Sequence, residues 1–295
     1  MTTPAFQHIA LIGKYQTAGS QEALSRLADF LAQMGIGVIL ETETALNTGL
    51  QGYKHAPIQE LSKHAKLALI MGGDGTMLGA GRMLAKQNMP VIGVNQGRLG
   101  FMTDIPLDGY TETLRPMLMG EYVEERRPMM QASVWRGEQC LMQTEALNDV
   151  VVNRGTSSGM IEMRVKVNDR FVANHRADGL ILASPTGSTA YALSAGGPIL
   201  HPDIPGWVMV PIAPHTLTNR PIVLSCREEV CIEVVSTRDG CANFDMHSLA
   251  SLQPGDQVRV RTSEYALRLL HPLGWSYFDT LRRKLRWNED AVLGR

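Results

Sequence analysis

The stretch MGGDGTMLGAG, residues 71–81, decides the fold of the first part of the chain. The apolar run LALIM just before it (67–71) predicts a buried strand, and the apolar spacing over about 76–86 predicts a helix. Glycines between the two let the backbone turn tightly and approach a ligand closely. The unpaired N–H groups at the start of the helix favour anions. Strand, glycine turn and helix therefore predict a phosphate-binding site.

Asp74 is the one carboxylate inside this glycine turn. Two interpretations are open: an ordinary turn in which Asp74 caps the helix, or an acid held against a phosphate. An acid repels a phosphate unless it accepts a proton or holds a metal ion, as carboxylates in kinases do. The turn alone suggests phosphoryl transfer and does not name the acceptor.

The first part of the chain alternates between expected strands and helices. Four apolar runs predict buried strands, at residues 8–13, 37–40, 67–71 and 91–94. A helical pattern at 20–34 separates the first two runs. This alternation predicts an α/β domain with an open, mostly parallel sheet over residues 1–125. Ligands of such sheets bind beyond the carboxyl ends of the strands.

Short alternating runs of apolar and polar residues replace this pattern after about residue 126. They predict half-buried strands joined by tight turns, with one helical interruption near 189–195. We therefore expect a β-rich, β-sandwich-like domain over residues 126–272. The tail, 273–295, is expected to form a helix that packs back on the first domain. Its expected apolar face consists of Phe278, Leu281, Leu285 and Trp287.

Composition narrows the class of protein. The 295 residues are 44% apolar and carry a formal net charge of −1, which gives no electrostatic reason to expect nucleic-acid or membrane binding. No apolar run reaches the roughly 20 residues of a transmembrane helix, and the first residues do not follow a secretory signal pattern. The four cysteines lack zinc spacing and are expected to be free, buried thiols. We therefore expect a cytoplasmic protein.

A second polar cluster follows in the β-rich part. RADG (176–179) precedes an apolar run, and SPTGSTAYALSAGGP (184–198) supplies hydroxyls that either cap a short helix or face a ligand. Tyr191 in this segment belongs either to the core or to a pocket. The pair Asn148-Asp149 interrupts a strand-like run, which indicates either a ligand contact or a β-bulge.

Five stretches together resemble the NAD kinase family. They are GGDGTML (72–78), GVNQGRLGFMTD (93–104), ALNDVV (146–151), RADGLILASPTGSTAYALSAGGPI (176–199) and PHTLTNRPI (214–222). The tail, LHPLGWSYFDTLRRKLRW (270–287), resembles the proteobacterial members. The resemblance covers nearly the whole chain, and the 176–199 string is far more specific than the glycine turn, which lipid kinases share.

The resemblance implies transfer of the γ-phosphate of ATP to the 2′-hydroxyl of the adenosine ribose of NAD, with a divalent metal such as Mg²⁺ carried by ATP. Asp74 would orient the hydroxyl and accept its proton. Phosphate contacts are implied for Gly72, Gly73, Gly75 and Thr76. NAD contacts are implied for Asp74, Gly75, Asn148, Asp149, Arg176, Asp178, Thr189, Ala190, Tyr191, Ala192, Leu193, Ser194 and His247.

The resemblance further implies a homo-oligomer, commonly a tetramer, formed through the β-rich domains, and a site between the two domains. The sequence departs from the family at 244–247, where FDMH replaces the commoner FDGQ, so that methionine stands where glycine is usual. A lipid or sugar kinase and a non-catalytic dinucleotide sensor are the alternative functions. Formation of NADP from NAD, ATP and Mg²⁺ would separate the three.

Overall fold

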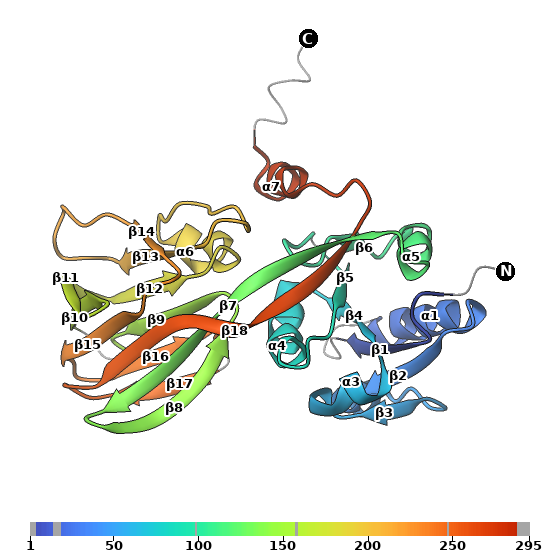
Figure 1. Cartoon of the computed structure of the whole chain (residues 1–295), viewed down its shortest axis with the longest axis horizontal. Helices are drawn as coiled ribbons and strands as arrows, with labels where there is room; N and C mark the ends of the chain where they lie inside the picture. The colour runs from blue at the N-terminus through green and yellow to red at the C-terminus, as the bar shows by residue number, and fades with distance from the viewer. Residues whose placement is uncertain (1–3, 14–18, 98, 157–158, 247, 288–295) are drawn as a thin grey trace, which may run out of the picture. The chain divides into compact units, whose positions relative to one another are not determined.

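The computed structural model describes residues 4–13, 19–97, 99–156, 159–246 and 248–287 (Figure 1). Contacts divide the chain into two compact units, which we call unit 1 (Met1–Arg126 with Leu267–Arg295) and unit 2 (Arg127–Ala266). Two long strands, β7 (Tyr122–Arg136) and β18 (Gln257–Pro272), run through both units. The domain division at 125/126 and 272/273 stays a prediction, because continuous strands cross between the units.

The sheet of unit 1 confirms the predicted open, parallel α/β arrangement. Its strands run in the order β5-β4-β1-β2-β3, and each neighbouring pair is parallel. These strands are β1 (His8–Gly13), β2 (Gly37–Glu41), β3 (Lys54–Ala56), β4 (Leu67–Gly72) and β5 (Val91–Asn95). β6 (Ile105–Pro106) and the end of β18 pair with β5, also in parallel. β4 and β5 are buried along their whole length, as in sheets covered on both faces.

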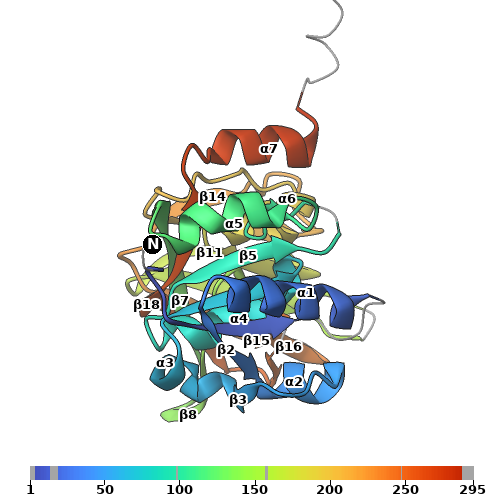
Figure 2. The same ribbon diagram turned by 90° about the vertical axis from the view of Figure 1, so that its right-hand side faces the viewer.

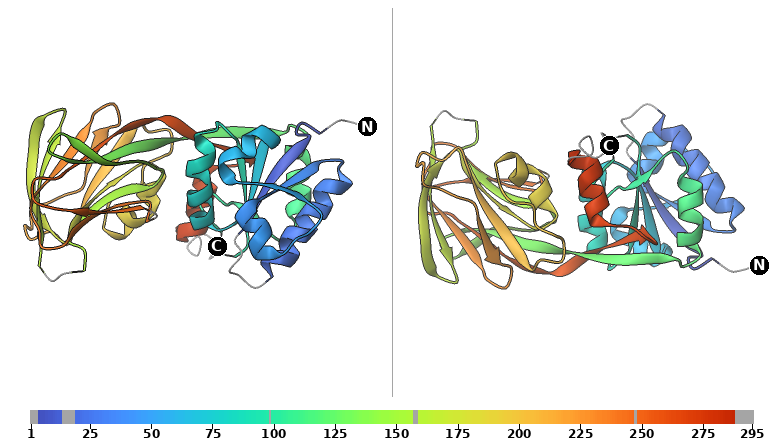
Figure 3. Two further views of the ribbon diagram at one scale, coloured as in Figure 1. Left: turned by 90° about the horizontal axis from the view of Figure 1, so that it is seen from below. Right: turned by 90° about the horizontal axis from the view of Figure 1, so that it is seen from above.

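Helices cover both faces of this sheet. They are α1 (Ser20–Gln33), α2 (Thr42–Thr48), α3 (Leu61–His64), α4 (Asp74–Ala85) and α5 (Tyr110–Leu118), with a 3-10 turn η1 (Ile58–Glu60) before α3. α1 and α5 pack side by side on one face, where the rings of Phe30 and Tyr110 meet edge to face at 6.0 Å (Figure 2). α4 covers the opposite face (Figure 3). None of the helices in the described residues is long and apolar enough to span a membrane.

Unit 2 confirms the predicted β-sandwich-like architecture. One sheet combines β7 and β18 with β8 (Gln139–Ala146), β10 (Ile161–Val167), β11 (Arg170–Ala177) and β15 (Val230–Ser236). The other is antiparallel, in the order β14-β13-β12-β9-β16-β17. Its strands are β9 (Asp149–Asn153), β12 (Gly179–Ala183), β13 (Gly206–Ile212), β14 (Ile222–Ser225), β16 (Gly240–Phe244) and β17 (Ser248–Leu252). Val165 of the first sheet shares one apolar core with Leu182 and Phe244 of the second. The helical interruption consists of η2 (Gly187–Thr189) and α6 (Tyr191–Ser194).

The tail forms α7 (Tyr277–Leu285), but the apolar face predicted for it is partly wrong. Leu281 is buried as expected, whereas Phe278 is 58% exposed and Trp287 is 50% exposed. Tyr277 takes a buried position instead. Residues four apart share one side of a helix, so burial of Tyr277 with Leu281 turns Phe278 outward.

The four cysteines are free, but the expectation that they are buried is wrong. Cys140 is exposed, and Cys226, Cys231 and Cys241 are half-buried. Cys231 stands between buried Val230 and Ile232 on β15. Because successive side chains of a strand point to opposite faces, the thiol lies on the outer face of the sheet.

Candidate active site

Asp74 does not cap helix α4. The N-cap residue is Gly73, and the Asp74 carboxylate contacts a loop that follows β5. Asp74 Oδ2 accepts the backbone N–H of Phe101 at 2.8 Å. Asp74 Oδ1 accepts the N–H groups of Met102 at 3.0 Å and Thr103 at 3.2 Å, and the Thr103 hydroxyl at 3.3 Å. We call residues 101–103 the Asp74 cradle, because they fix the direction of this carboxylate.

Three glycines make this arrangement sterically possible. A Cβ on Gly100 would lie 2.2 Å from Asp74 Oδ1, and a Cβ on Gly93 would lie 2.6 Å from the Met102 carbonyl oxygen. A Cβ on Gly72 would lie 2.5 Å from the Thr76 hydroxyl. The protein's own packing therefore requires these glycines, whether or not a ligand is bound.

Gly73 and Gly75 differ from those three. Apart from the adjoining residues and the backbone of α4 itself, no atom of the described residues lies within 4 Å of the Cβ position of either one. Neither has the left-handed backbone conformation that favours glycine. Open space at these two positions would let a phosphate reach the backbone N–H groups at the start of α4.

Contacts from two further elements hold the cradle. Asn95, the last residue of β5, donates from Nδ2 to the Thr103 hydroxyl at 3.0 Å and to its carbonyl oxygen at 3.3 Å. Lys284 of α7 donates to the Leu99 carbonyl oxygen and lies 5.7 Å from the centre of the Phe101 ring. The tail helix thus braces the loop that orients Asp74.

In unit 2, the pair Asn148-Asp149 is held by Asp245, to which the sequence assigned no role. The Asp245 carboxylate accepts the backbone N–H groups of Leu147 at 2.7 Å, Asn148 at 2.8 Å and Asp149 at 3.0 Å. β9 begins at Asp149, so the pair lies at a strand start rather than at a bulge within it. Asn148 Oδ1 is buried without a hydrogen-bond partner in the described part of the chain, which favours the ligand-contact interpretation.

Asp149 has an unusual protonation equilibrium. Its side chain is 4% exposed. Burial, and then the negative charge of Asp245, raise the pKa of the Asp149 carboxyl to about 7. Acids with pKa values near neutrality gather at functional sites, because they can change charge under working conditions.

The segment after β12 packs directly against Asn148. Ser184 donates its backbone N–H to the Asn148 carbonyl at 2.8 Å and its hydroxyl to the Leu147 carbonyl at 2.5 Å. A Cβ on Gly187 would lie 2.0 Å from the Asn148 carbonyl oxygen. The structure therefore brings together the Asn148-Asp149 pair and the start of the hydroxyl-rich segment, which lie far apart in the sequence.

The predicted NAD-binding positions 189–194 differ in exposure. Tyr191 is 42% exposed, so the alternative that it fills the core is wrong. Ala192 is fully buried in an apolar cluster with Ile181, which leaves only its backbone for a ligand. Of the others, Ser194 is exposed and Thr189, Ala190 and Leu193 are half-buried.

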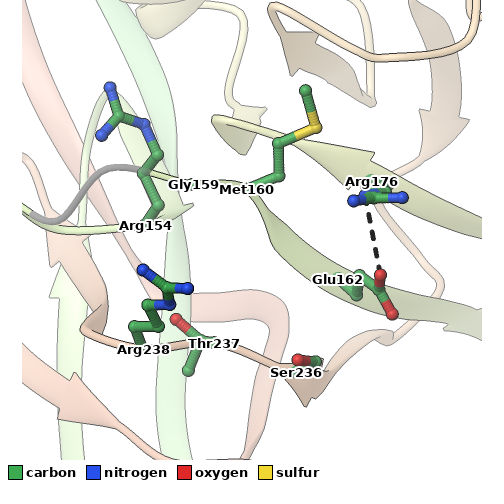
Figure 4. Close-up of a pocket in the computed structure, with 8 residues that line it drawn as sticks. All are labelled: Arg154, Gly159, Met160, Glu162, Arg176, Ser236, Thr237 and Arg238. Carbon is green, nitrogen blue, oxygen red and sulfur yellow. Dashed lines mark ion pairs between the residues drawn. The ribbon is translucent and has the colours of Figure 1, made fainter.

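Arg176 lies at a hollow of about 420 Å³ in unit 2, where it pairs with Glu162 at 3.7 Å (Figure 4). Arg154 and Arg238 line the same hollow. Arg154 also pairs with Asp178 at 2.9 Å. Arg176 thus lines the same hollow as Arg154, the ion-pair partner of Asp178, and three guanidinium groups and the Glu162 carboxylate face this hollow.

Sequence reasoning missed the cradle and Asp245. Glycines at 93 and 100 were the available signal for the cradle, because a loop rich in glycine can pass close to other backbone. The stretch FDMH at 244–247 contains Asp245, but nothing in it points to the partners of this carboxylate, which lie nearly a hundred positions away. His247, predicted to contact NAD, lies outside the described residues.

The fold and the site define a kinase. A carboxylate fixed by backbone N–H groups stands beyond the carboxyl end of a parallel strand, beside two glycines with open access. Residues 9–122 match the ATP-NAD kinase N-terminal domain, and residues 147–272 match the ATP-NAD kinase C-terminal domain. The chain belongs to the ATP-NAD kinase family.

Similarity to named relatives extends over the whole length. The chain is 61% identical over 287 residues to the NAD kinase of a Polaromonas species, covering 97% of this chain and 99% of the relative. It is 58% identical over 297 residues to the NAD kinase of Delftia acidovorans, covering 98% and 100%. The resemblance to proteobacterial NAD kinases is therefore confirmed.

Two solved structures share the fold. One is a yeast NADH kinase complexed with NADH, with a TM-score of 0.87 and 22% identity over 96% of this chain and 88% of that chain. The other is an NAD kinase from Archaeoglobus fulgidus in complex with ATP, with a TM-score of 0.74 and 24% identity over 95% and 98%. At these identities the likeness establishes the fold.

Proposed function

We propose that this chain phosphorylates the 2′-hydroxyl of the adenosine ribose of NAD with ATP, and that Asp74 orients this hydroxyl. Its family, and identities of 61% and 62% with named NAD kinases, support the reaction. The role of Asp74 rests on one observation: three backbone N–H groups and one hydroxyl fix its carboxylate next to glycines with open access.

The cradle leaves a position on Asp74 for a substrate. Within the described residues, Oδ1 accepts three hydrogen bonds, whereas Oδ2 accepts one, from Phe101. Each carboxylate oxygen carries two lone pairs, so the three donors at Oδ1 share its lone pairs, whereas Oδ2 retains one for a hydroxyl. A hydroxyl bound there directs its own lone pairs away from Asp74, which prepares its oxygen to attack phosphorus.

The transfer step makes one bond and breaks one. The hydroxyl oxygen bonds to the γ-phosphorus while the bond from that phosphorus to the β,γ-bridging oxygen breaks, and ADP keeps the electron pair. A loose transition state demands little of a base until the new bond is well formed, so the proton passes to Asp74 late. Asp74 therefore acts first by orientation and afterwards as proton acceptor.

The donor is Mg²⁺-bound ATP, in which the metal arrives with the substrate and keeps several of its waters. Gly73 and Gly75 border its phosphates, together with the first N–H groups of α4. Gly72 and Thr76 shape the turn, because the two residues pack on each other. Within the described residues, no group of three or more acidic, histidine or cysteine side chains could hold a metal ion.

Unit 2 supplies the contacts to the dinucleotide. The orphaned Asn148 Oδ1 and the raised pKa of Asp149 support this role. The proposed contacts are Asn148, Asp149, Arg176, Asp178, Thr189, Ala190, Tyr191, Leu193 and Ser194, with Ala192 through its backbone and Gly75 from unit 1. His247 stays a prediction.

An Asp74→Asn variant tests the assignment. With purified full-length chain, NAD, ATP and Mg²⁺, we expect NADP formation to fall by about 10²–10⁴-fold. NAD affinity, measured by calorimetry, should change by less than about threefold. Near-normal turnover in the variant would refute the role of Asp74. If the wild type binds NAD without forming NADP, the protein is a dinucleotide sensor. If it neither binds NAD nor forms NADP, both the NAD kinase and the sensor are excluded.

A homo-oligomer, a tetramer formed through unit 2, is the second part of this proposal. β11 and β14 are edge strands of the two sheets. They expose the apolar side chains Phe171, Val172, Ile222 and Val223. Exposed apolar edges are typical of interfaces between chains. Sedimentation velocity measures the assembly, and a monomer at micromolar concentration would contradict it. The cytoplasmic location stays a prediction.

A further inference from the structure

His271, near the end of β18, is buried between two carboxylates. Its Nδ1 lies 2.9 Å from Asp104 Oδ2, and its Nε2 lies 3.1 Å from Glu125 Oε2. The Trp275 ring stacks on the imidazole, with the ring centres 3.8 Å apart. The side chain of His271 is 1% exposed. A neutral imidazole has only one N–H donor. Hydrogen bonds to both carboxylates therefore require the doubly protonated ring.

The surroundings favour that charged form. Burial disfavours an imidazolium, but hydrogen bonds with Asp104 and Glu125, and the negative charges of both, outweigh burial and raise the pKa of His271 above its usual value. In its charged form His271 donates to the loop residue Asp104 and to Glu125 of β7 at the same time.

Asp104 connects this buried ion cluster to the Asp74 cradle. It directly follows Thr103, whose N–H and hydroxyl both bind Asp74. Immediately after Asp104, Ile105 of β6 pairs with Val94 of β5. His271 thus holds the chain at the point where it leaves the cradle and joins the sheet.

We propose that His271 is a positioning residue for phosphoryl transfer, which keeps the cradle aligned on Asp74 by holding Asp104. The inference rests on the function proposed for Asp74. His271 acts on the orientation of the carboxylate and not on substrate affinity, so its loss should lower kcat while KM for NAD stays nearly constant.

Two variants separate the two hydrogen bonds of His271. In His271→Asn the amide nitrogen replaces Nδ1, which faces Asp104. In His271→Gln the amide nitrogen reaches toward the position of Nε2, which faces Glu125. Both variants lose the positive charge and the stacking on Trp275, so they form a matched pair that differs mainly in the hydrogen bond retained.

The experiment measures kcat, KM for NAD and the thermal midpoint of the full-length chain, and amide hydrogen exchange of the cradle. We expect similar thermal midpoints, but a kcat at least about tenfold lower in His271→Gln than in His271→Asn, with KM within about threefold. Exchange of the Phe101 and Thr103 amides should be faster in His271→Gln. Equal kcat values in the two variants, or equal exchange, would overturn the proposal.

A pH profile adds an independent readout. In the wild type, His271 loses a proton as the pH rises through its raised pKa, and the single N–H of the neutral ring is then divided between the Asp104 side and the Glu125 side, so Asp104 keeps its donor in only part of the molecules. kcat should therefore fall on the alkaline side in the wild type, and this fall should be absent from His271→Asn. The same fall in both proteins would count against His271. Hydrogen exchange requires no enzymatic activity. It therefore tests the effect of His271 on the cradle even if the role proposed for Asp74 is wrong.

Discussion

The backbone N–H of Asp149 donates a hydrogen bond of 3.0 Å to the carboxylate of Asp245, which brings two buried acids together. The Asp245 carboxylate also accepts hydrogen bonds from two further backbone N–H groups, those of Leu147 and Asn148. Asp149 instead responds to burial and to the charge of Asp245 with a pKa raised to about 7. The Asp245 carboxylate is thus held by three backbone N–H donors, whereas the Asp149 carboxyl can change its charge near neutral pH.

This relationship predicts how stability depends on pH. The unfolded chain releases the Asp149 proton near 3.8, so the stabilisation linked to the raised pKa is complete below that pH and is lost as the pH rises to about 7. Asp149→Asn cannot ionise. Between about pH 5 and about pH 8, the wild type should therefore lose about 2–3 kcal/mol relative to the variant. Urea unfolding at both pH values measures this difference, and parallel pH profiles would contradict the buried-acid interpretation.

Substitutions at Gly72 and Gly75 should separate a structural glycine from a ligand-binding one. Gly75→Ala adds a methyl group in open space on a helix, so stability should rise by up to about 1 kcal/mol. If a phosphate approaches the backbone there, KM for ATP should rise at least about tenfold. Gly72→Ala should instead destabilise the fold by about 1–3 kcal/mol, because its Cβ would meet Thr76. An unchanged KM in Gly75→Ala would remove this glycine from the site.

Gly100 tests whether the cradle sets the orientation of Asp74. A Cβ on Gly100 would lie 2.2 Å from Asp74 Oδ1, so Gly100→Ala must displace the carboxylate or the loop. We expect kcat to fall by about 10²-fold, the size of effect that an ångström of misplacement produces. Gly97→Ala is the matched control, because nothing in the described structure lies within 4 Å of its Cβ position. Steady-state kinetics of both variants would decide, and equal kcat values would mean that the loop yields without moving Asp74.

Sequence periodicity predicted the strands of unit 1 well. Ile9, Leu11, Leu67 and Leu69 lie in short runs that are apolar throughout, and the structure buries all four in one core. A short run that is apolar at every position is typical of a strand covered on both faces, so the sequence itself indicates these strands. The face of α7 was harder to predict, because Phe278 and Tyr277 are adjacent aromatic residues and only tertiary packing decides which one is buried.

The site was predictable only where chemistry is local in sequence. The glycine turn pointed to Asp74 because strand, turn and helix follow one another within a few residues. The contacts that orient Asp74 come from Phe101 to Thr103, and those that hold Asn148 come from Asp245. Side-chain to backbone contacts over such separations leave no periodic trace, so only the folded chain reveals them.

The backbone of Met246 is strained in the turn at Asp245, and a substitution can measure this strain. The φ of Met246 is +58°, in the left-handed region that costs a side-chain-bearing residue roughly 1 kcal/mol. Its side chain is 77% exposed, so little packing offsets that strain. Met246→Gly should therefore raise the free energy of unfolding by about 1 kcal/mol, measured by urea denaturation. Met160→Gly is the control: it is also exposed but outside the left-handed region, so glycine there should lower stability. Destabilisation by both substitutions would show that Met246 makes contacts that outweigh its backbone strain.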